Sequence, residues 1–308
     1  IIDSYIQQQS SKKENIDYKL AFDLIKQKKY DQAMVEVNKL IKRDPKQSSL
    51  HNIKAFLYIV EGKNELAKQS LTTALKLKSD SPFTFITLAK LALNEKKLEQ
   101  AKQYANKVLE ITPYSKSAYT VLADVITQQH GINAVEKFLL ETMPKVKGNV
   151  DTELAFIEML RKIYNTQKLP KKILPLAENL ANQHKNIPEV LSFFVDVLLV
   201  NQDTAKAEKI LRQIILQNPK DGKHLLSLAQ LLGSQKGKET EAFELLARAE
   251  NNLKIPTLAL ALKTNLHLKL HQYQKAFDLS LHIIESFPKQ SIGYVLKGNT
   301  LRAQKKYG

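Results

Sequence analysis

Apolar side chains recur at helical spacing along the chain, and the same arrangement returns about every 34 residues. The pattern is clearest from Leu88 to Pro113, where two apolar stretches are separated by the polar turn NEKK and closed by a proline. Small residues, Ala89 and Ala101, mark the face on which the two stretches would pack. A period of this length predicts helix–turn–helix units stacked in tandem, in which each unit buries its apolar face against its neighbours.

The phase of the repeat predicts eight helix pairs and the first helix of a ninth. The pairs are expected over residues 14–47, 48–81, 82–115, 116–147, 148–186, 187–221, 222–256 and 257–290, with the ninth beginning at residue 291. This gives an array of four repeats over residues 14–147 and a second array over residues 148–308. Residues 1–13 are expected to be an N-terminal segment or the end of a preceding helix. Pro175 falls near a second helix, where it is tolerated only in the first turn.

The third repeat carries a recognisable set of residues at fixed offsets: Phe85, Leu88, Ala89, Ala92, Ala101, Ala105, Val108 and Pro113. With these residues, and their counterparts in register along the chain, the protein resembles the tetratricopeptide repeat family. The resemblance implies an all-α, right-handed superhelical solenoid of tandem antiparallel helix pairs. It also implies that the first helices line a concave groove that binds proteins or peptides, without enzymatic activity.

The resemblance places a partner-binding groove on particular positions of the first helices. In the first three repeats these are Tyr18, Phe22, Ile25, Asn52, Phe56, Ile59, Phe83, Ile86 and Lys90, followed by Leu93. In the fourth and sixth repeats they are Thr120, Asp124, Thr127, Gln128, Ser192 and Asp196. Two interpretations of the apolar stripe remain open. In the first, these side chains are core or are covered by residues 1–14. In the second, they form an apolar groove that binds a peptide or helix.

The net charge is +16, and all but five of the 47 basic residues are lysines. The excess is spread along the chain, whereas a nucleic-acid reader clusters its charge and uses arginine forks. We therefore expect no specific nucleic-acid partner and interpret the lysines mainly as a solvated surface. An acidic polysaccharide remains an alternative partner for this surface.

Candidate chemistry is sparse. There is no cysteine, so the chain has no thiolate ligand or cysteine nucleophile. The turn GSQKGKET after Leu232 fails the spacing of a phosphate-binding loop. His267 and His271 are four residues apart on one helix face, but no third ligand follows nearby. The sequence therefore predicts a non-enzymatic protein with no catalytic residue, cofactor or metal site.

The chain begins at Ile1 without methionine, and we expect it to be part of a longer bacterial protein. It resembles, more narrowly, the long tetratricopeptide lipoproteins of bacterial exopolysaccharide export and PEP-CTERM protein sorting. That resemblance implies a periplasmic or outer-membrane-tethered location rather than a cytoplasmic one. A further alternative is the non-catalytic repeat region of a larger enzyme. No apolar run approaches the roughly 20 residues that a membrane-spanning helix needs.

Overall fold

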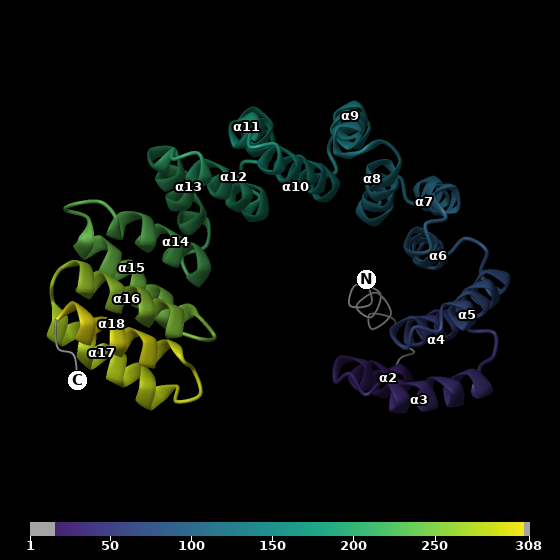
Figure 1. Cartoon of the computed structure of the whole chain (residues 1–308), viewed down its shortest axis with the longest axis horizontal. Helices are drawn as coiled ribbons and strands as arrows, with labels where there is room; N and C mark the ends of the chain where they lie inside the picture. Colours follow the sequence, from purple (N-terminus) through teal and green to yellow (C-terminus); the bar gives the residue numbers. More distant parts are fainter. Residues whose placement is uncertain (1–15, 305–308) are drawn as a thin grey trace. The chain divides into compact units, whose positions relative to one another are not determined.

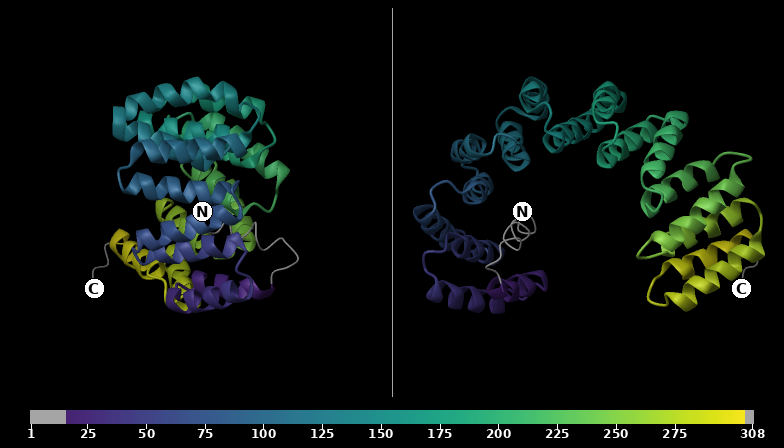
Figure 2. Two further views of the ribbon diagram at one scale, coloured as in Figure 1. Left: turned by 90° about the vertical axis from the view of Figure 1, so that its right-hand side faces the viewer. Right: turned by 180° about the vertical axis from the view of Figure 1, so that it is seen from behind.

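The computed structural model describes residues 16–304, so the predicted segment 1–13 lies outside the described residues. Within this range the chain forms seventeen α-helices and two short 3₁₀ helices, and no strand is found there. Figure 1 and Figure 2 show the helices running back and forth in chain order. The prediction of an all-α solenoid of tandem antiparallel helix pairs is confirmed.

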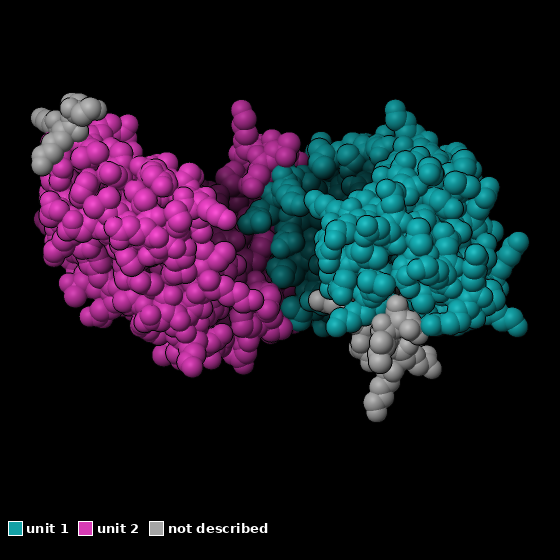
Figure 3. Space-filling model, turned by 90° about the horizontal axis from the view of Figure 1, so that it is seen from below, with its two compact units in different colours: residues 1–163 teal, residues 164–308 magenta. Residues whose placement is uncertain are grey.

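The chain divides into two compact units, residues 1–163 and residues 164–308, shown in separate colours in Figure 3. The first unit contains four helix pairs and most of a further helix. Its helices are α2 (Ile16–Lys26), α3 (Tyr30–Arg43), α4 (Ser48–Val60), α5 (Asn64–Leu77), α6 (Pro82–Asn94), α7 (Leu98–Ile111), α8 (Lys116–His130), α9 (Ile132–Thr142), η1 (Met143–Val146) and α10 (Val150–Thr166), in which the unit boundary falls.

The second unit continues the same pattern and includes one helix, α18, that follows the last pair. Its elements after α10 are η2 (Pro170–Ile173), α11 (Leu174–Gln183), α12 (Pro188–Val200), α13 (Thr204–Gln217), α14 (Gly222–Gly233), α15 (Glu239–Asn252), α16 (Thr257–Lys269), α17 (Tyr273–Ser286) and α18 (Ile292–Ala303). No described helix is long and apolar enough to cross a membrane.

Alanines sit where the two helices of a pair approach one another. Ala21 and Ala33 in the first pair, and Ala89 and Ala101 in the third, have no solvent-exposed surface. A methyl group lets the two backbones come close, and a larger side chain at such a closely packed position would cost about 1–3 kcal/mol. The recurrent alanines therefore allow the two helices of these pairs to pack closely.

Most first helices end in the same backbone turn, which reverses the chain. The second residue after the helix has a positive φ, and the next N–H bonds back to a carbonyl five residues earlier, as in a Schellman motif. In the first pair, Lys28 has a φ of 60° and the Lys29 N–H donates to the Leu24 oxygen over 2.9 Å. The described chain repeats this turn with its positive-φ residue at Gly62, Lys96, Lys168, Gln202 and His271.

Two irregular features of the fourth and fifth pairs have local causes. Gly131, with a φ of 81°, both ends α8 and begins α9, so this turn is shorter than the others. Pro170 begins the 3₁₀ helix η2, and Pro175 lies in the first turn of α11. Because the first N–H groups of a helix have no intrahelical acceptor, Pro175 removes no interior hydrogen bond there.

Candidate functional site

The apolar stripe predicted on the first helices of unit 1 is largely packed between helices. Phe22, Ile25 and Ile86 are buried, each with at most 6% of its surface exposed. The half-buried members of the stripe pack against buried clusters: Tyr18, Phe56 and Phe83 against the one that includes Phe22, and Ile59 against the one that includes Leu71. This burial favours the core interpretation for the buried members, and contact of the stripe with a partner stays a prediction.

Asn52, also predicted in the groove, takes part in a buried polar contact between two first helices. The Thr84 hydroxyl on α6 donates to the Asn52 side-chain oxygen on α4 over 2.9 Å. Both residues are buried, with 2% of Asn52 and none of Thr84 exposed. The amide oxygen is therefore used to join successive repeats.

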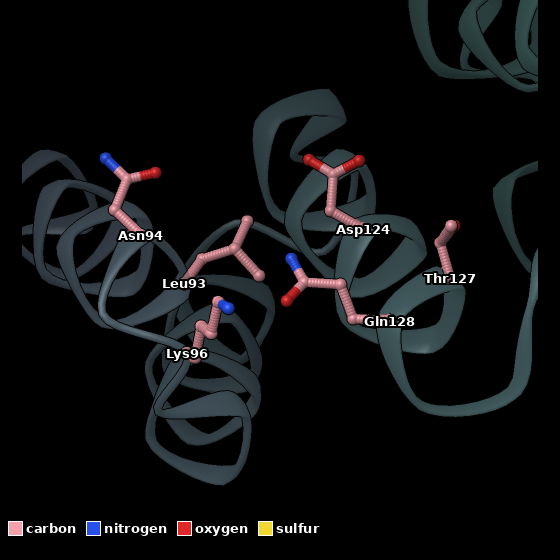
Figure 4. Close-up of a pocket in the computed structure, with 6 residues that line it drawn as sticks. All are labelled: Leu93, Asn94, Lys96, Asp124, Thr127 and Gln128. Carbon is pink, nitrogen blue, oxygen red and sulfur yellow. The ribbon is translucent and has the colours of Figure 1, made fainter.

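A pocket opens between the first helices α6 and α8. It is lined by Leu93, Asn94, Lys96, Asp124, Thr127 and Gln128 and has a volume of about 360 Å³. The first three residues come from the end of α6 and the turn after it, and the other three come from α8. Figure 4 shows Leu93 and Gln128 facing one another, with Asn94 and Asp124 at the same rim.

The local structure explains why these side chains meet. α6 stops at Asn94, and Lys96 takes up the positive φ of the turn, 59°, so the end of the helix presents both residues beside α8. Asp124, Thr127 and Gln128 are three or four residues apart, which puts them on one face of α8. The Thr127 hydroxyl donates to the Ala123 carbonyl over 2.8 Å, which leaves lone pairs of its oxygen available as acceptors.

Two groups of opposite charge flank this pocket. Lys90 lies one helical turn before Asn94 on α6, and Asp124 lies on α8. Partial burial lowers the pKa of Lys90 and raises the pKa of Asp124, and it is the largest cause in each case. The attraction between the two charges opposes both changes. Each charge has lost part of its hydration, so a ligand that offers polar contacts can compensate for the loss.

Four of these residues are among the groove positions predicted from the repeat phase. Leu93, Asp124, Thr127 and Gln128 were predicted there, and the structure brings them together in one pocket with Lys90 nearby. Sequence reasoning missed Asn94 and Lys96, which belong to the helix end and the turn. The polar turn NEKK, which contains both residues, could have indicated them, because a residue at the end of a first helix can lie beside the next first helix.

Comparison with known proteins identifies the repeat that forms one wall of this pocket. Residues 84–115 match the family described as "Tetratricopeptide repeat". The match covers most of the third helix pair. Buried alanines and the same turn recur in several other pairs, so the chain has a tetratricopeptide-like fold.

Two solved structures of tetratricopeptide proteins are similar to this chain. Yeast Tom70 is 15% identical with a TM-score of 0.54, over 90% of this chain and 59% of the Tom70 chain. YrrB, described as a TPR protein with an unusual peptide-binding site, is 20% identical with a TM-score of 0.40, over 63% of this chain and 97% of its own. No protein of curated function matches the chain in sequence. The Tom70 likeness supports the tetratricopeptide fold.

Other candidate residues in the helical array form local contacts. His267 Nδ1 lies 2.7 Å from the Gln272 side-chain oxygen, and His271 Nδ1 lies 2.8 Å from the Tyr273 hydroxyl. Among the described residues, no group of three or more His, Cys, Asp or Glu side chains is placed to hold a metal ion. Gly237, in the stretch GSQKGKET, has a φ of 85° in the turn between α14 and α15.

Proposed function

We propose that unit 1 of this protein is a scaffold that holds an extended segment of a partner protein, without chemistry, at the pocket between α6 and α8. The observation that carries the proposal is the composition of that pocket, in which side-chain amides, a hydroxyl, opposite charges and one leucine converge from two first helices. The half-buried Tyr18, Phe56 and Phe83 extend the proposed contact surface along unit 1.

A peptide backbone needs both donors and acceptors, and this pocket offers both. The amides of Asn94 and Gln128 each provide an N–H₂ donor and an oxygen acceptor. Asp124 accepts hydrogen bonds and Lys96 donates them, while Leu93 offers apolar surface for a side chain of the bound segment. The mixture suits a protein segment better than a purely apolar or purely anionic ligand.

A role as a lipoprotein in exopolysaccharide export or protein sorting, with a periplasmic location, rests on the sequence resemblance alone, as does membership of a larger enzyme. An acidic polysaccharide is the alternative ligand of the lysine-rich surface. Its binding would weaken steeply with salt because exposed charges are screened, whereas a pocket of amides and leucine would be less sensitive.

The test begins by selecting peptides from a displayed random-peptide library on the intact chain. The affinity of the best peptide is then measured by fluorescence polarisation for Asn94→Ala, Gln128→Ala and Asp124→Asn. Loss of one hydrogen bond costs about 0.5–1.5 kcal/mol, so we expect each variant to bind roughly 2- to 10-fold more weakly.

Lys102→Ala is the matched control, because Lys102 is exposed on the second helix α7 of the same repeat. Circular dichroism and a thermal melt establish that each variant is folded. The proposal fails if no peptide is selected, or if the selected peptide binds the three pocket variants as tightly as the parent.

A further inference from the structure

A serine, a histidine and an aspartate lie in line within unit 2. His224 Nε2 is 2.5 Å from the Ser192 hydroxyl oxygen, and His224 Nδ1 is 2.6 Å from the Asp221 carboxylate. Ser192 belongs to α12, while His224 belongs to α14 and Asp221 is the residue that precedes α14. The three residues therefore come together only through the packing of two successive first helices.

Asp221 is fixed by its position as the N-cap of α14. One of its oxygens accepts from the N–H groups of Lys223 and His224, over 3.1 and 3.2 Å, and the other faces the imidazole. Burial alone would raise the pKa of Asp221, but the hydrogen bonds and charge interaction with His224 and the N–H of Lys223 outweigh it and lower that pKa. The carboxylate thus stays ionised and holds the imidazole in one orientation.

This orientation decides which nitrogen of His224 faces the serine. A carboxylate is an acceptor only, so Nδ1 carries the proton shared with Asp221, and Nε2 is left to accept from the Ser192 hydroxyl. The same hydroxyl also donates to the Pro188 carbonyl oxygen over 2.7 Å. Its single hydrogen therefore has two acceptors, and the imidazole can withdraw it when the hydroxyl turns toward Nε2.

Unit 1 offers an internal comparison at the same spacing. Thr84 and Asn52 are 32 residues apart and link two successive first helices, as Ser192 and His224 do. Neither member of the unit 1 contact is a base, so a simple hydrogen bond is enough to join two repeats there. In unit 2 the corresponding contact also contains an imidazole and a carboxylate, which a hydrogen bond between two repeats does not need.

We propose that Ser192 is a nucleophile, with His224 as its general base and Asp221 as a positioning residue, and that unit 2 cleaves small activated carboxylic esters. This activity goes beyond the scaffold function and uses a different unit. The arrangement matches the roles of a serine–histidine–aspartate triad, which recurs on unrelated folds and is recognised by geometry.

The reaction balances with water as the only co-reactant. The Ser192 oxygen bonds to the ester carbonyl carbon and its proton moves to His224 Nε2; the bond to the leaving alcohol then breaks as that oxygen takes the proton. Water next attacks the acyl-serine, again losing a proton to Nε2. That proton returns to Ser192, releasing the carboxylic acid.

Two features of the site limit the expected rate. Ser192 is half-buried and its hydroxyl lies between His224 Nε2 and the Pro188 carbonyl oxygen, so the proposal is confined to small esters. It also lies inside α12, where its backbone N–H is engaged in the helix and is not available to stabilise the oxyanion. We therefore expect slow turnover and choose covalent labelling as the primary readout.

The test treats the full chain with a small alkyl fluorophosphonate, in which the Ser192 oxygen bonds to phosphorus and fluoride leaves. Mass spectrometry identifies the labelled residue, and hydrolysis of p-nitrophenyl acetate is followed in parallel. We expect label on Ser192, none in Ser192→Ala, and labelling slowed about 100-fold or more in His224→Gln, since a positioned general base contributes about 10²–10⁴-fold. Ser227→Ala is the matched control, because the Ser227 hydroxyl on α14 bonds only to the Lys223 carbonyl among the contacts described.

Asp221→Asn separates positioning from structure. Asparagine caps a helix as well as aspartate, so the unfolding midpoint should hold, while labelling slows at every pH because an amide no longer favours the reactive tautomer. Absence of label on Ser192, or a rate equal to the parent's in a folded His224→Gln or Asp221→Asn, would each overturn the proposal.

Discussion

The guanidinium of Arg212 on α13 forms a two-pronged ion pair with the Glu241 carboxylate on α15, with nitrogen–oxygen distances of 2.6 and 3.0 Å. Arg212 also bonds to Glu208 on its own helix, over 2.8 and 3.0 Å. The pair joins the second helices of two successive repeats. Its geometry is that of the strongest class of surface pairs, because both partners are planar and matched.

Glu241→Gln should remove this link between repeats in a pH-dependent way. Hydrogen bonding from Arg212 lowers the pKa of the folded Glu241 carboxyl below its ordinary value of 4.5. The stabilisation is therefore fully present above about pH 4.5 and is lost as the pH falls through the lower folded pKa. Both side chains are more than a third exposed, so we expect about 0.2–1 kcal/mol at pH 7.

Urea unfolding of parent and Glu241→Gln between pH 3 and pH 7 measures this difference. Glu244→Gln, an exposed carboxylate on the same helix, is the control. A gap between Glu241→Gln and the parent that is constant across the range would contradict the assignment.

Gly62→Ala should destabilise unit 1 through the backbone alone. Gly62 has a φ of 73°, and a Cβ added there would meet no atom within 4 Å. The added methyl group therefore brings no clash with a neighbour, but it disfavours the left-handed conformation that the turn needs, at about 1 kcal/mol. Chemical denaturation of both proteins measures the change.

Gly298→Ala, the same chemical change, should stabilise the protein. Gly298 lies within α18 in an ordinary helical conformation, and a Cβ there also meets no atom within 4 Å. Alanine is the better helix former, so stability should rise by about 0.5–1 kcal/mol. If both glycines responded in the same direction, the backbone argument would be wrong.

Thr84→Val should destabilise the protein by removing the buried hydrogen bond between α4 and α6. Valine keeps the shape of threonine but leaves the Asn52 oxygen without its donor in a buried site, at a cost of about 1–3 kcal/mol. Thr120→Val is the control, because that hydroxyl is exposed and bonds only within its helix among the contacts described. Equal midpoints for Thr84→Val and the parent in thermal denaturation would show that the bond is dispensable.

The repeat period predicted the fold because the same helix–turn–helix pattern of apolar and polar residues recurs along the chain. Ala89 and Ala101 indicate that two helices pack closely. The missing N–H of Pro175 restricts it to the first turn of a helix, where it lies. The same phase put Leu93, Asp124, Thr127 and Gln128 on one side of the first helices. These inferences need only the spacing of residues within a repeat.

Contacts between repeats were harder to predict, because they depend on the rotation of each pair against the next. Ser192 was assigned to an inner position, but nothing in the spacing indicates that His224 and Asp221 meet it. Asn94 and Lys96 were missed for a related reason, since they lie where a helix ends. The burial of Phe22 likewise depends on neighbouring helices that one repeat cannot reveal.

The turns that close the first helices carry a consequence for how the array opens. At Gly62 and Lys96 the backbone completes the hydrogen bonds of the helix before the chain starts the next one. These turns lie between the two helices of one pair, so a pair keeps its own completed turn when a neighbouring pair unfolds. Amide protons should exchange with solvent in successive blocks, each one helix pair long, so that the array shortens stepwise and the pairs that remain keep their structure.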